Sequence, residues 1–510
     1  MKYRISNKIN TKIIGISLAL AMLLPVLSLA QNRGNALGFQ GLDQLNLPSA
    51  RIASLGGSYT AVSGDVNSLY MNPAGLAGLD KMQLSFTANS SKRTWRENQI
   101  YRPNRRFVTM AFYLEGLYVP DPANNGMWDH EVFYEGLLDT LYQVSLPDTG
   151  LMAYSKEAAD WEYSKGNIGF SDISFALPLT VFNRNLTLAV GVRPQMPILD
   201  YDRNTTYLDP HIAYIEYGIL PTADGTDTIR MNWYDFERSR NGSMFSVNAG
   251  AAMEVLPWLS AGFNMEYSSG WSDDVQQKTK VGYFDLYDDN QFMFSYDTLN
   301  TRYEGSSRFS SLKTNVGLLL SHERVSVGFN LNLPYTINRS FSYMKTVTDT
   351  LGFVNSDVSG TESLKAPLGF SLGLAFNPLE NFMLSIEIAQ TPFNNSVFTF
   401  SPDLEEFQRT WANQHTLAFG AEYKPLDYLA IRAGFRSVSQ VFVPDGAAII
   451  TKGPEQISWS FGLGYTVGKL GTLDISYVMT DLKYYDQYFS NVNYVSETTG
   501  RWMLGYTISL

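Results

Sequence analysis

Apolar residues alternate with a period of two along much of this chain, and the alternation recurs in short hairpins. In residues 415–436, for example, Leu417 and Phe419 share one face of a predicted strand, and Ala418 and Gly420 share the other. The same design recurs at residues 174–192, 245–267, 314–334, 370–390 and 459–479. Because successive side chains of a strand point to opposite faces, the pattern predicts an all-β fold of antiparallel hairpins.

The two faces of these strands differ in composition. One face is apolar, and the other carries Gly, Ser, Asn and Thr with single charges at Arg193, Glu254, Glu266, Glu387, Arg432 and Asp474. In a soluble sandwich the apolar face would cover a core, whereas in a transmembrane barrel it faces lipid and the mixed face lines the lumen. Short turns alternate with long connections, as in residues 197–242 and 269–310, and this asymmetry favours the membrane barrel.

Composition agrees with an exported membrane barrel. The 510 residues include 31 Tyr, 30 Phe and no Cys, and the formal net charge is −11. Without Cys the chain has neither disulfide bonds nor a cysteine-linked lipid anchor, and its acidity makes nucleic acid an improbable partner. No apolar run of helical span length follows residue 30, so any membrane crossing requires a closed barrel, in which every backbone group is paired.

The first thirty residues predict a secretory signal peptide. They begin with a basic stretch, continue with an apolar run over residues 13–29, and end in the small-x-small cleavage site Ser28-Leu29-Ala30. A membrane anchor is the alternative, but the apolar run is short for a span. We therefore expect three parts: a signal peptide (1–30), an N-terminal hatch or plug (31–80) and a barrel with long extracellular loops (81–510).

The hairpins add up to about fourteen strands, and bacterial barrels have an even number. The predicted starts lie near Lys81, Ile168, Leu186, Met244, Leu259, Leu312, Arg324, Leu368, Phe382, His415, Tyr428, Gln456, Gly471 and Arg501. Residues 106–114 also alternate, but a further strand would make the number odd, so we assign them to the first outer loop. The last predicted strand runs to Leu510 with alternating apolar residues. It resembles the closing strand that outer-membrane barrels present to the barrel-assembly machinery.

Residues 31–80 precede the first predicted strand and are rich in small and turn-forming residues. A barrel of about fourteen strands has a lumen wider than its own side chains fill, so it leaks unless a segment plugs it. Pro73 cannot continue a strand ladder, and the glycines of the segment permit tight packing. These properties predict a compact plug in the lumen.

This segment, "ARIASLGGSYTAVSGDVNSLYMNPAGLAG" with its motif Asn72-Pro73-Ala74, resembles the N-terminal hatch of the FadL family of outer-membrane transport proteins. The resemblance implies a fourteen-stranded barrel in the outer membrane of a Gram-negative bacterium. It implies passive uptake of hydrophobic small molecules such as long-chain fatty acids through a hatch-gated barrel. The expected partners are that substrate, outer-membrane lipid and the assembly machinery, with no cofactor.

Two other functions stay open at this point. PorV-type barrels of type IX secretion share a similar barrel and hatch, so a role in protein secretion or surface attachment is the main alternative. A soluble or fibrous β adhesin is the third. Neighbouring genes and cell fractionation would distinguish them.

The third predicted strand carries Pro194 and Pro197 toward its outer end. On one interpretation the strand ends at Val192 and both prolines lie in the following loop. On the other, which the FadL resemblance implies, a kink opens a side door to the lipid. Arg193, Pro194 and Pro197 would then form the opening, and the hatch motif Asn72-Pro73-Ala74 would face it.

Catalytic and metal-binding patterns are weak. None of the four histidines (His130, His211, His322 and His415) has a metal-like neighbour at short spacing, and neither a nucleophile elbow nor a phosphate-binding loop occurs. Two carboxylate runs could hold calcium, but such runs are more typical of solvated loops: Asp285, Asp288 and Asp289, and Asp403, Glu405 and Glu406. We therefore expect no enzyme, no catalytic residue and no bound metal.

Overall fold

The computed structural model describes residues 39, 41, 44, 46–101, 154–156, 159, 161–181, 184–196, 203–209, 229–286, 292–401, 411–444, 451–468, 471–488 and 491–510. The predicted signal peptide and residues 106–114 lie outside these ranges, so both stay predictions. The side chains of the two carboxylate runs also lie outside the described residues, so the expectation about calcium stays a prediction.

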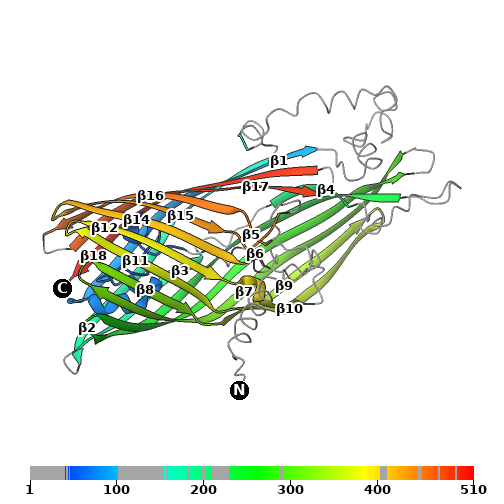
Figure 1. Cartoon of the computed structure of the whole chain (residues 1–510). Coiled ribbons are helices and arrows are strands. Elements are labelled where there is room, and N and C mark those ends of the chain that lie inside the picture. Colours follow the sequence, from blue (N-terminus) through cyan, green and yellow to red (C-terminus); the bar gives the residue numbers. More distant parts are fainter. Residues whose placement is uncertain are drawn as a thin grey trace, which may run out of the picture.

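The described strands form one closed antiparallel barrel (Figure 1). Their bounds are β1 Gln83–Tyr101, β2 Trp161–Val181, β3 Arg184–Met196, β4 Arg203–Asp209, β5 Ile229–Leu256, β6 Leu259–Leu286, β7 Phe292–His322, β8 Val325–Asn332, β9 Tyr335–Asp349, β10 Gly352–Ala366, β11 Gly369–Leu379, β12 Phe382–Thr391, β13 Val397–Thr399, β14 Gln414–Leu426, β15 Leu429–Ser439, β16 Glu455–Val467, β17 Gly471–Tyr488 and β18 Asn491–Ser509.

Four wall strands are interrupted and are each made of two segments, β3 with β4, β8 with β9, β10 with β11, and β12 with β13. The barrel therefore has fourteen strands within the described residues, as predicted. It closes where β1 pairs with β18, with Gln83 opposite Ser509. Each of the fourteen predicted starts falls in or beside a different wall strand.

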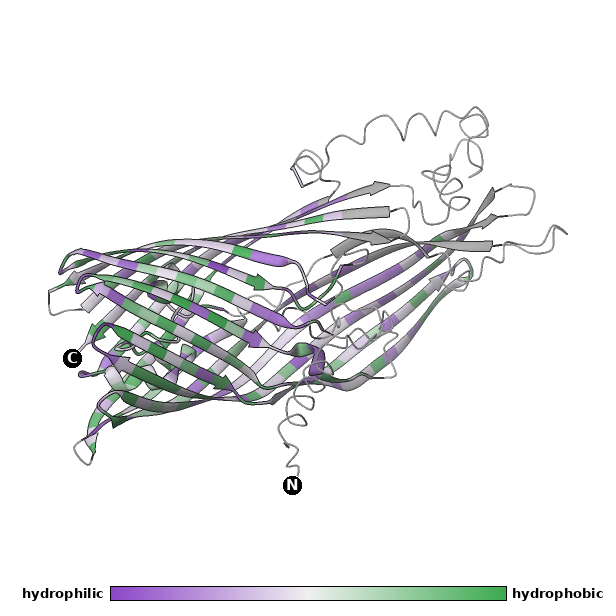
Figure 2. Ribbon diagram, viewed as in Figure 1, coloured by the Kyte–Doolittle hydropathy of each residue, from purple (hydrophilic) through white to green (hydrophobic). Residues whose placement is uncertain are grey.

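The alternation of the sequence separates the two faces of the wall. Leu417 and Phe419 are exposed on the outside, whereas Ala418 is buried on the inside. The predicted inward charges follow the same rule, since Arg193, Glu266, Glu387, Arg432 and Asp474 are all buried, and Glu254 is half-buried. Figure 2 shows hydrophobic residues gathering on the half of the barrel that holds the C-terminus, which is the half a bilayer would surround.

We call the end of the barrel with the short turns and Leu510 the turn end, and the opposite one the outer end (Figure 1). The wall is tallest along β5, β6 and β7, which have 28, 28 and 31 residues. At about 3.3 Å per residue and a tilt near 45°, such strands rise roughly 70 Å, against an apolar band of about 25 Å.

The prediction that residues 269–310 form a long connection was therefore wrong. Most of them continue β6 and β7, and residues 203–209 and 229–242 of the other predicted connection are also strand. The reason is physical. Beyond the bilayer both faces of these strands meet water, so both are polar, and the period-two signal disappears although the ladder continues.

The described helices are short: α2 Ala50–Ser54, α3 Ser68–Met71, η2 Pro73–Gly78 and η5 Phe393–Asn395. Among the described residues, no helix has the length and apolar character needed to span a membrane.

Candidate functional site

Residues 46–80 lie inside the barrel toward its turn end, with α2 against β15–β18 and η2 against β3 and β5–β7. The segment thus reaches across the lumen from one wall to the other. Local rules set its turns, because the Ser49 hydroxyl accepts from the Ile52 amide (3.3 Å) at the start of α2. Asn72 does the same for η2, which begins at Pro73.

The motif Asn72-Pro73-Ala74 is buried against β6 and β7. The Asn72 amide donates to the carbonyl oxygens of Thr60 (2.6 Å) and Leu318 (3.0 Å), and its Oδ1 accepts from the Ala74 amide (3.1 Å). A Cβ atom on Gly317 would collide with the Asn72 side chain, and one on Gly262 would collide with Pro73. Glycine at these two wall positions is what allows the motif to approach so closely.

The prediction that this motif faces Arg193, Pro194 and Pro197 was wrong. The residue that lies against Arg193 and Pro194 is Asn46, whose amide donates to the Pro194 carbonyl (2.8 Å) and whose carbonyl accepts from Arg193 (3.3 Å). The glycines of β6 and β7 hold the predicted motif at another part of the wall. Pro197 lies outside the described residues.

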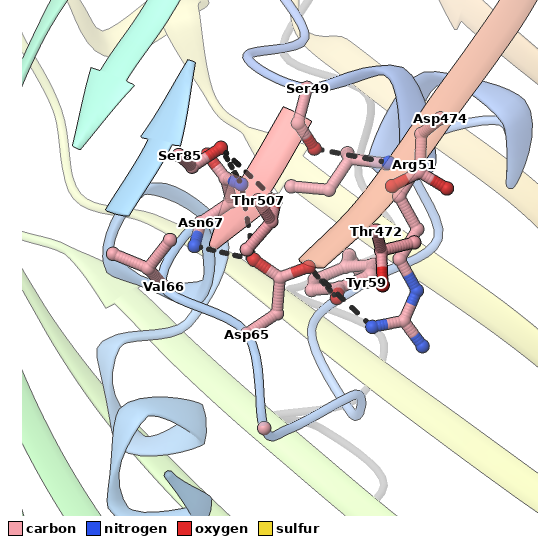
Figure 3. A network of polar contacts seen from close by, with 12 residues as sticks. Ser49, Arg51, Tyr59, Asp65, Val66, Asn67, Ser85, Thr472, Asp474 and Thr507 are labelled. Atoms are coloured by element: carbon pink, nitrogen blue, oxygen red, sulfur yellow. Dashed lines mark hydrogen bonds and ion pairs between the residues drawn. The ribbon is translucent and has the colours of Figure 1, made fainter. Parts of the chain in front are cut away.

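Ion pairs connect the segment to the wall at its turn end, and Figure 3 shows the pair that Arg51 also makes with Asp65 within the segment. Arg51 pairs with Asp65 of the same segment (3.5 Å) and with Glu422 of β14 (3.3 Å). Arg432 of β15 also pairs with Glu422 (2.6 Å) and with Asp474 (2.6 Å), so the charges alternate in sign. Removing one member of such a buried set leaves an uncompensated charge.

The hydroxyl of Tyr59 completes this network by donating to Asp65 (3.1 Å). Burial raises the pKa of Tyr59 well above its ordinary value, so its hydroxyl keeps its proton and remains a donor. Asp65 also accepts from the Asn67 amide (2.8 Å), which fixes the turn before α3. These hydrogen bonds hold the segment together beside the ion pairs that tie it to the wall.

An apolar cluster fills part of the lumen outside the segment. Its buried members come from distant parts of the chain and include four large aromatic side chains: Phe39, Met244, Phe309, Ile337, Leu364, Ala366, Phe393, Trp411 and Val441. The ring of Trp411 stacks edge-on against Phe393 (5.1 Å) and Phe398 (5.5 Å). Such a surface in the lumen of a barrel can hold a hydrophobic molecule out of water. We call this set the apolar cluster.

A charged layer lies directly outside the apolar cluster. Arg339 lies two residues from Ile337 on β9, and Glu362 lies two residues from Leu364 on β10. The side chains of Arg339 and Glu362 form an ion pair (2.5 Å). Arg240 of β5 pairs in the same way with Asp274 of β6 (2.7 Å). The layer is therefore balanced in charge and marks where the lumen changes from apolar to polar.

The wall is unpaired on one side between β2 and β3. Their ladder ends at Ile173 and Val192, and within the described residues the outer part of β2 pairs with β1 alone. Within the described residues, Pro194 lies in β3 and pairs only with β5, next to a register shift between Pro194 and Met196. The strand therefore does not end at Val192, and the first interpretation of the prolines was wrong for Pro194.

Side chains at this break link the inside of the barrel with its outside. Met244 is buried in the apolar cluster opposite Met196, while its neighbour Phe245 is exposed and stacks on Phe170 of β2 (6.1 Å). Arg193 is buried in a pair with Glu266 (2.8 Å). The sequence alone gave no signal for Asn46, Phe39 or Trp411, because each lies outside the alternating strands.

No group of three or more His, Asp or Glu side chains is placed to hold a metal ion in the part of the chain that the structure describes.

Neither a protein-family model nor a curated protein matches this chain. Solved structures do match it. A FadL homologue of Pseudomonas aeruginosa has 13% sequence identity and a TM-score of 0.54, with 90% of this chain and 98% of that chain covered. The toluene transporter TodX of P. putida has 11% identity and a TM-score of 0.54, covering 92% and 99%. The toluene transporter TbuX of Ralstonia pickettii has 9% identity and a TM-score of 0.52, covering 92% and 99%.

These similarities confirm the predicted resemblance to FadL-type proteins at the level of the fold. The closed barrel has an apolar outer face where a bilayer would surround it, and its fold is that of outer-membrane transporters. The fold and the apolar outer face agree with the predicted location in the outer membrane of a Gram-negative bacterium.

Proposed function

We propose that this protein is an outer-membrane channel for the passive uptake of hydrophobic small molecules, long-chain fatty acids and monoaromatic hydrocarbons being the two classes to test first. The structural neighbours named as toluene transporters support the second class, and the sequence resemblance supports the first. On this proposal the protein is not an enzyme and needs no cofactor.

The observation that carries the proposal is that the apolar cluster reaches the wall where the wall is unpaired. Met244 belongs to the cluster and lies opposite Met196, two residues from Pro194. A hydrophobic molecule in the cluster therefore has a short way to the outer face near Phe245, where lipid would surround it. It avoids the cost of entering water on that route.

On this proposal, residues 31–80 act as a hatch that closes the direct route to the turn end. The described part of this segment is mostly buried, hydrogen-bonded to the wall at β7 and tied to β14 by Arg51. Arg193 and Pro194 form the side opening with Asn46 as its inner contact. Asn72-Pro73-Ala74 anchors the hatch to β6 and β7.

The test is to restore the missing ladder. The double variant Pro194→Thr, Pro197→Val regains two backbone donors at the break and should slow uptake of labelled oleate or toluene by roughly tenfold, without loss of barrel stability. Pro334→Thr is the matched control, because Pro334 interrupts the wall between β8 and β9, away from the break. It should leave uptake unchanged.

Surface expression and heat-modified gel mobility would establish that each variant is a folded barrel. Unchanged uptake of both molecules in the double variant would exclude the side opening at this position. The PorV-type alternative would be supported by two results together. Cells that lack the protein would take up both molecules as well as cells that make it, and they would lose surface-attached proteins.

A further inference from the structure

A second lumenal space differs from the apolar cluster in carrying charged and polar side chains among its lining residues. It is a cavity of about 1270 Å³, including the solvent at its mouth, between the N-terminal segment and the wall formed by β14–β18 and β1. Its lining has three arginines, four glutamines and one glutamate, together with several Ser and Thr hydroxyls. We call it the polar cavity.

The charges that line the polar cavity do not balance. Arg93 pairs with Glu497 (2.7 Å), the one carboxylate of the lining. Arg436 and Arg501 also line it, and neither has a carboxylate within ion-pair distance among the described residues. The lining therefore carries two positive charges in excess, in contrast to the charged layer near the apolar cluster.

Of these two arginines, Arg436 has the less satisfied guanidinium group. It is only 8% exposed, and its Nη1 has no hydrogen-bond partner among the described residues. The carboxylate that interacts electrostatically with it is that of Glu387, which already accepts from the amides of Tyr59 (3.0 Å) and Thr60 (2.9 Å). A buried guanidinium with an unsatisfied donor is costly unless a ligand supplies the acceptor.

Arg501 lies on the neighbouring wall with a neutral partner. Its Nη1 donates to the Asn46 side-chain oxygen (2.6 Å), and Asn46 in turn contacts Pro194 at the break in the wall. An anion that draws Arg501 away would thus act on the residue that lies inside the side opening. The polar cavity and the opening share this one residue.

We propose that the polar cavity binds a carboxylate through Arg436 and Arg501. A guanidinium matches the two oxygens of a carboxylate, and the glutamine amides and hydroxyls of the lining supply further donors. The carboxylate can belong to a small soluble acid or to the head of a molecule whose apolar part reaches the apolar cluster. The site binds its anion whether or not apolar molecules cross the wall, so it does not depend on the proposed uptake.

The experiment is calorimetric titration of the purified full-length mature barrel in a non-ionic detergent. Three probes separate the sources: succinate is a soluble carboxylate, 4-phenylbutyrate joins a carboxylate to an apolar group, and 4-phenylbutanol lacks the charge. At least one carboxylate should bind, more weakly as salt is raised. Arg436→Gln and Arg501→Gln should each weaken it roughly tenfold, the loss of one charge-assisted hydrogen bond, and leave 4-phenylbutanol unchanged.

Two further variants keep the test decisive. Arg302→Gln is the matched control, since Arg302 is exposed on the outer part of β7 and pairs with Glu304 there. It should not change any affinity. Arg436→Lys keeps the positive charge. If Arg436→Gln loses affinity because the charge is missing, and not because packing around Gly57 is altered, Arg436→Lys should recover part of that affinity.

Succinate binding that matches 4-phenylbutyrate would support a site for soluble acids, and binding of 4-phenylbutyrate alone would support a headgroup site. The proposal is overturned if neither carboxylate binds the wild-type barrel. It is equally overturned if Arg436→Gln and Arg501→Gln bind the carboxylates as the control does.

Discussion

The two sides of the lumen are built differently, although the same period-two wall surrounds both. On the side of β5–β13 the lumen holds the apolar cluster, and the nearby arginines are paired with carboxylates. On the side of β14–β18 it holds the polar cavity, where Arg436 and Arg501 have no such partner among the described residues. The N-terminal segment lies beneath both and contacts each wall.

Inward-facing positions of a barrel therefore need not form one uniform pore. Porin lumens are polar throughout, because water fills them. Here one side offers a surface on which a hydrophobic molecule loses its contact with water, and the other keeps donors and positive charge. A barrel with such a divided lumen can hold a molecule that has both an apolar and an anionic part.

The largest expected effect comes from removing the segment that lies beneath both sides. Deleting residues 31–80 from the mature chain should leave a closed barrel, because the β1–β18 pairing does not involve them. Conductance in planar bilayers should rise roughly tenfold or more, since a barrel of this size has an open lumen without a plug. Recordings that show no new conductance, with heat-modified mobility retained, would refute the hatch role.

The next effect should fall on the apolar side alone. Phe309→Ser removes a buried ring from the apolar cluster and should weaken binding of toluene or 4-phenylbutanol about tenfold or more, the worth of one buried aromatic side chain. Phe353→Ser is the control, because Phe353 on β10 is 69% exposed. Equal affinity in both variants would show that hydrophobic molecules bind elsewhere.

Sequence reasoning could predict the wall but not the site, and particular residues show why. Leu417 and Ala418 reveal their faces because lipid and lumen demand different side chains at neighbouring positions. Pro194 raised the question of a break, since proline lacks a ladder donor. Trp411 and Asn46 gave no signal, because their partners are far away in the chain and only the closed barrel brings them together.

The ion pairs of the hatch should matter more than similar pairs at the surface. Arg51→Ala leaves Glu422 and Asp65 with less compensation and should destabilise the docked segment by about 3 kcal/mol. Arg184→Ala breaks a longer, half-exposed pair with Glu254 (3.8 Å) and should cost less than about 1 kcal/mol. Hydrogen exchange of residues 50–79 measures the difference, and equal protection in the two variants would contradict it.

The smallest expected effect tests the contact between the hatch and the break. The Tyr70 hydroxyl donates to Asp172 of β2 (2.5 Å), and the Arg193 guanidinium lies over the Tyr70 ring (4.7 Å). Burial raises the pKa of Tyr70, so the hydroxyl stays a donor at physiological pH. Tyr70→Phe keeps the ring and removes only the hydrogen bond, which contributes about 1 kcal/mol.

If this bond holds the hatch against β2 beside the break, Tyr70→Phe should speed amide exchange in α3 severalfold and change uptake by less than the Pro194→Thr, Pro197→Val variant does. The ring of residue 70 still contacts Arg193 in this variant. The ion pair between Arg193 and Glu266 should therefore stay intact. Tyr59→Phe is the matched control, because its hydroxyl bonds Asp65 within the hatch and not the wall. Faster exchange in α3 for Tyr59→Phe but not for Tyr70→Phe would place the sensitive contact within the N-terminal segment, away from the break.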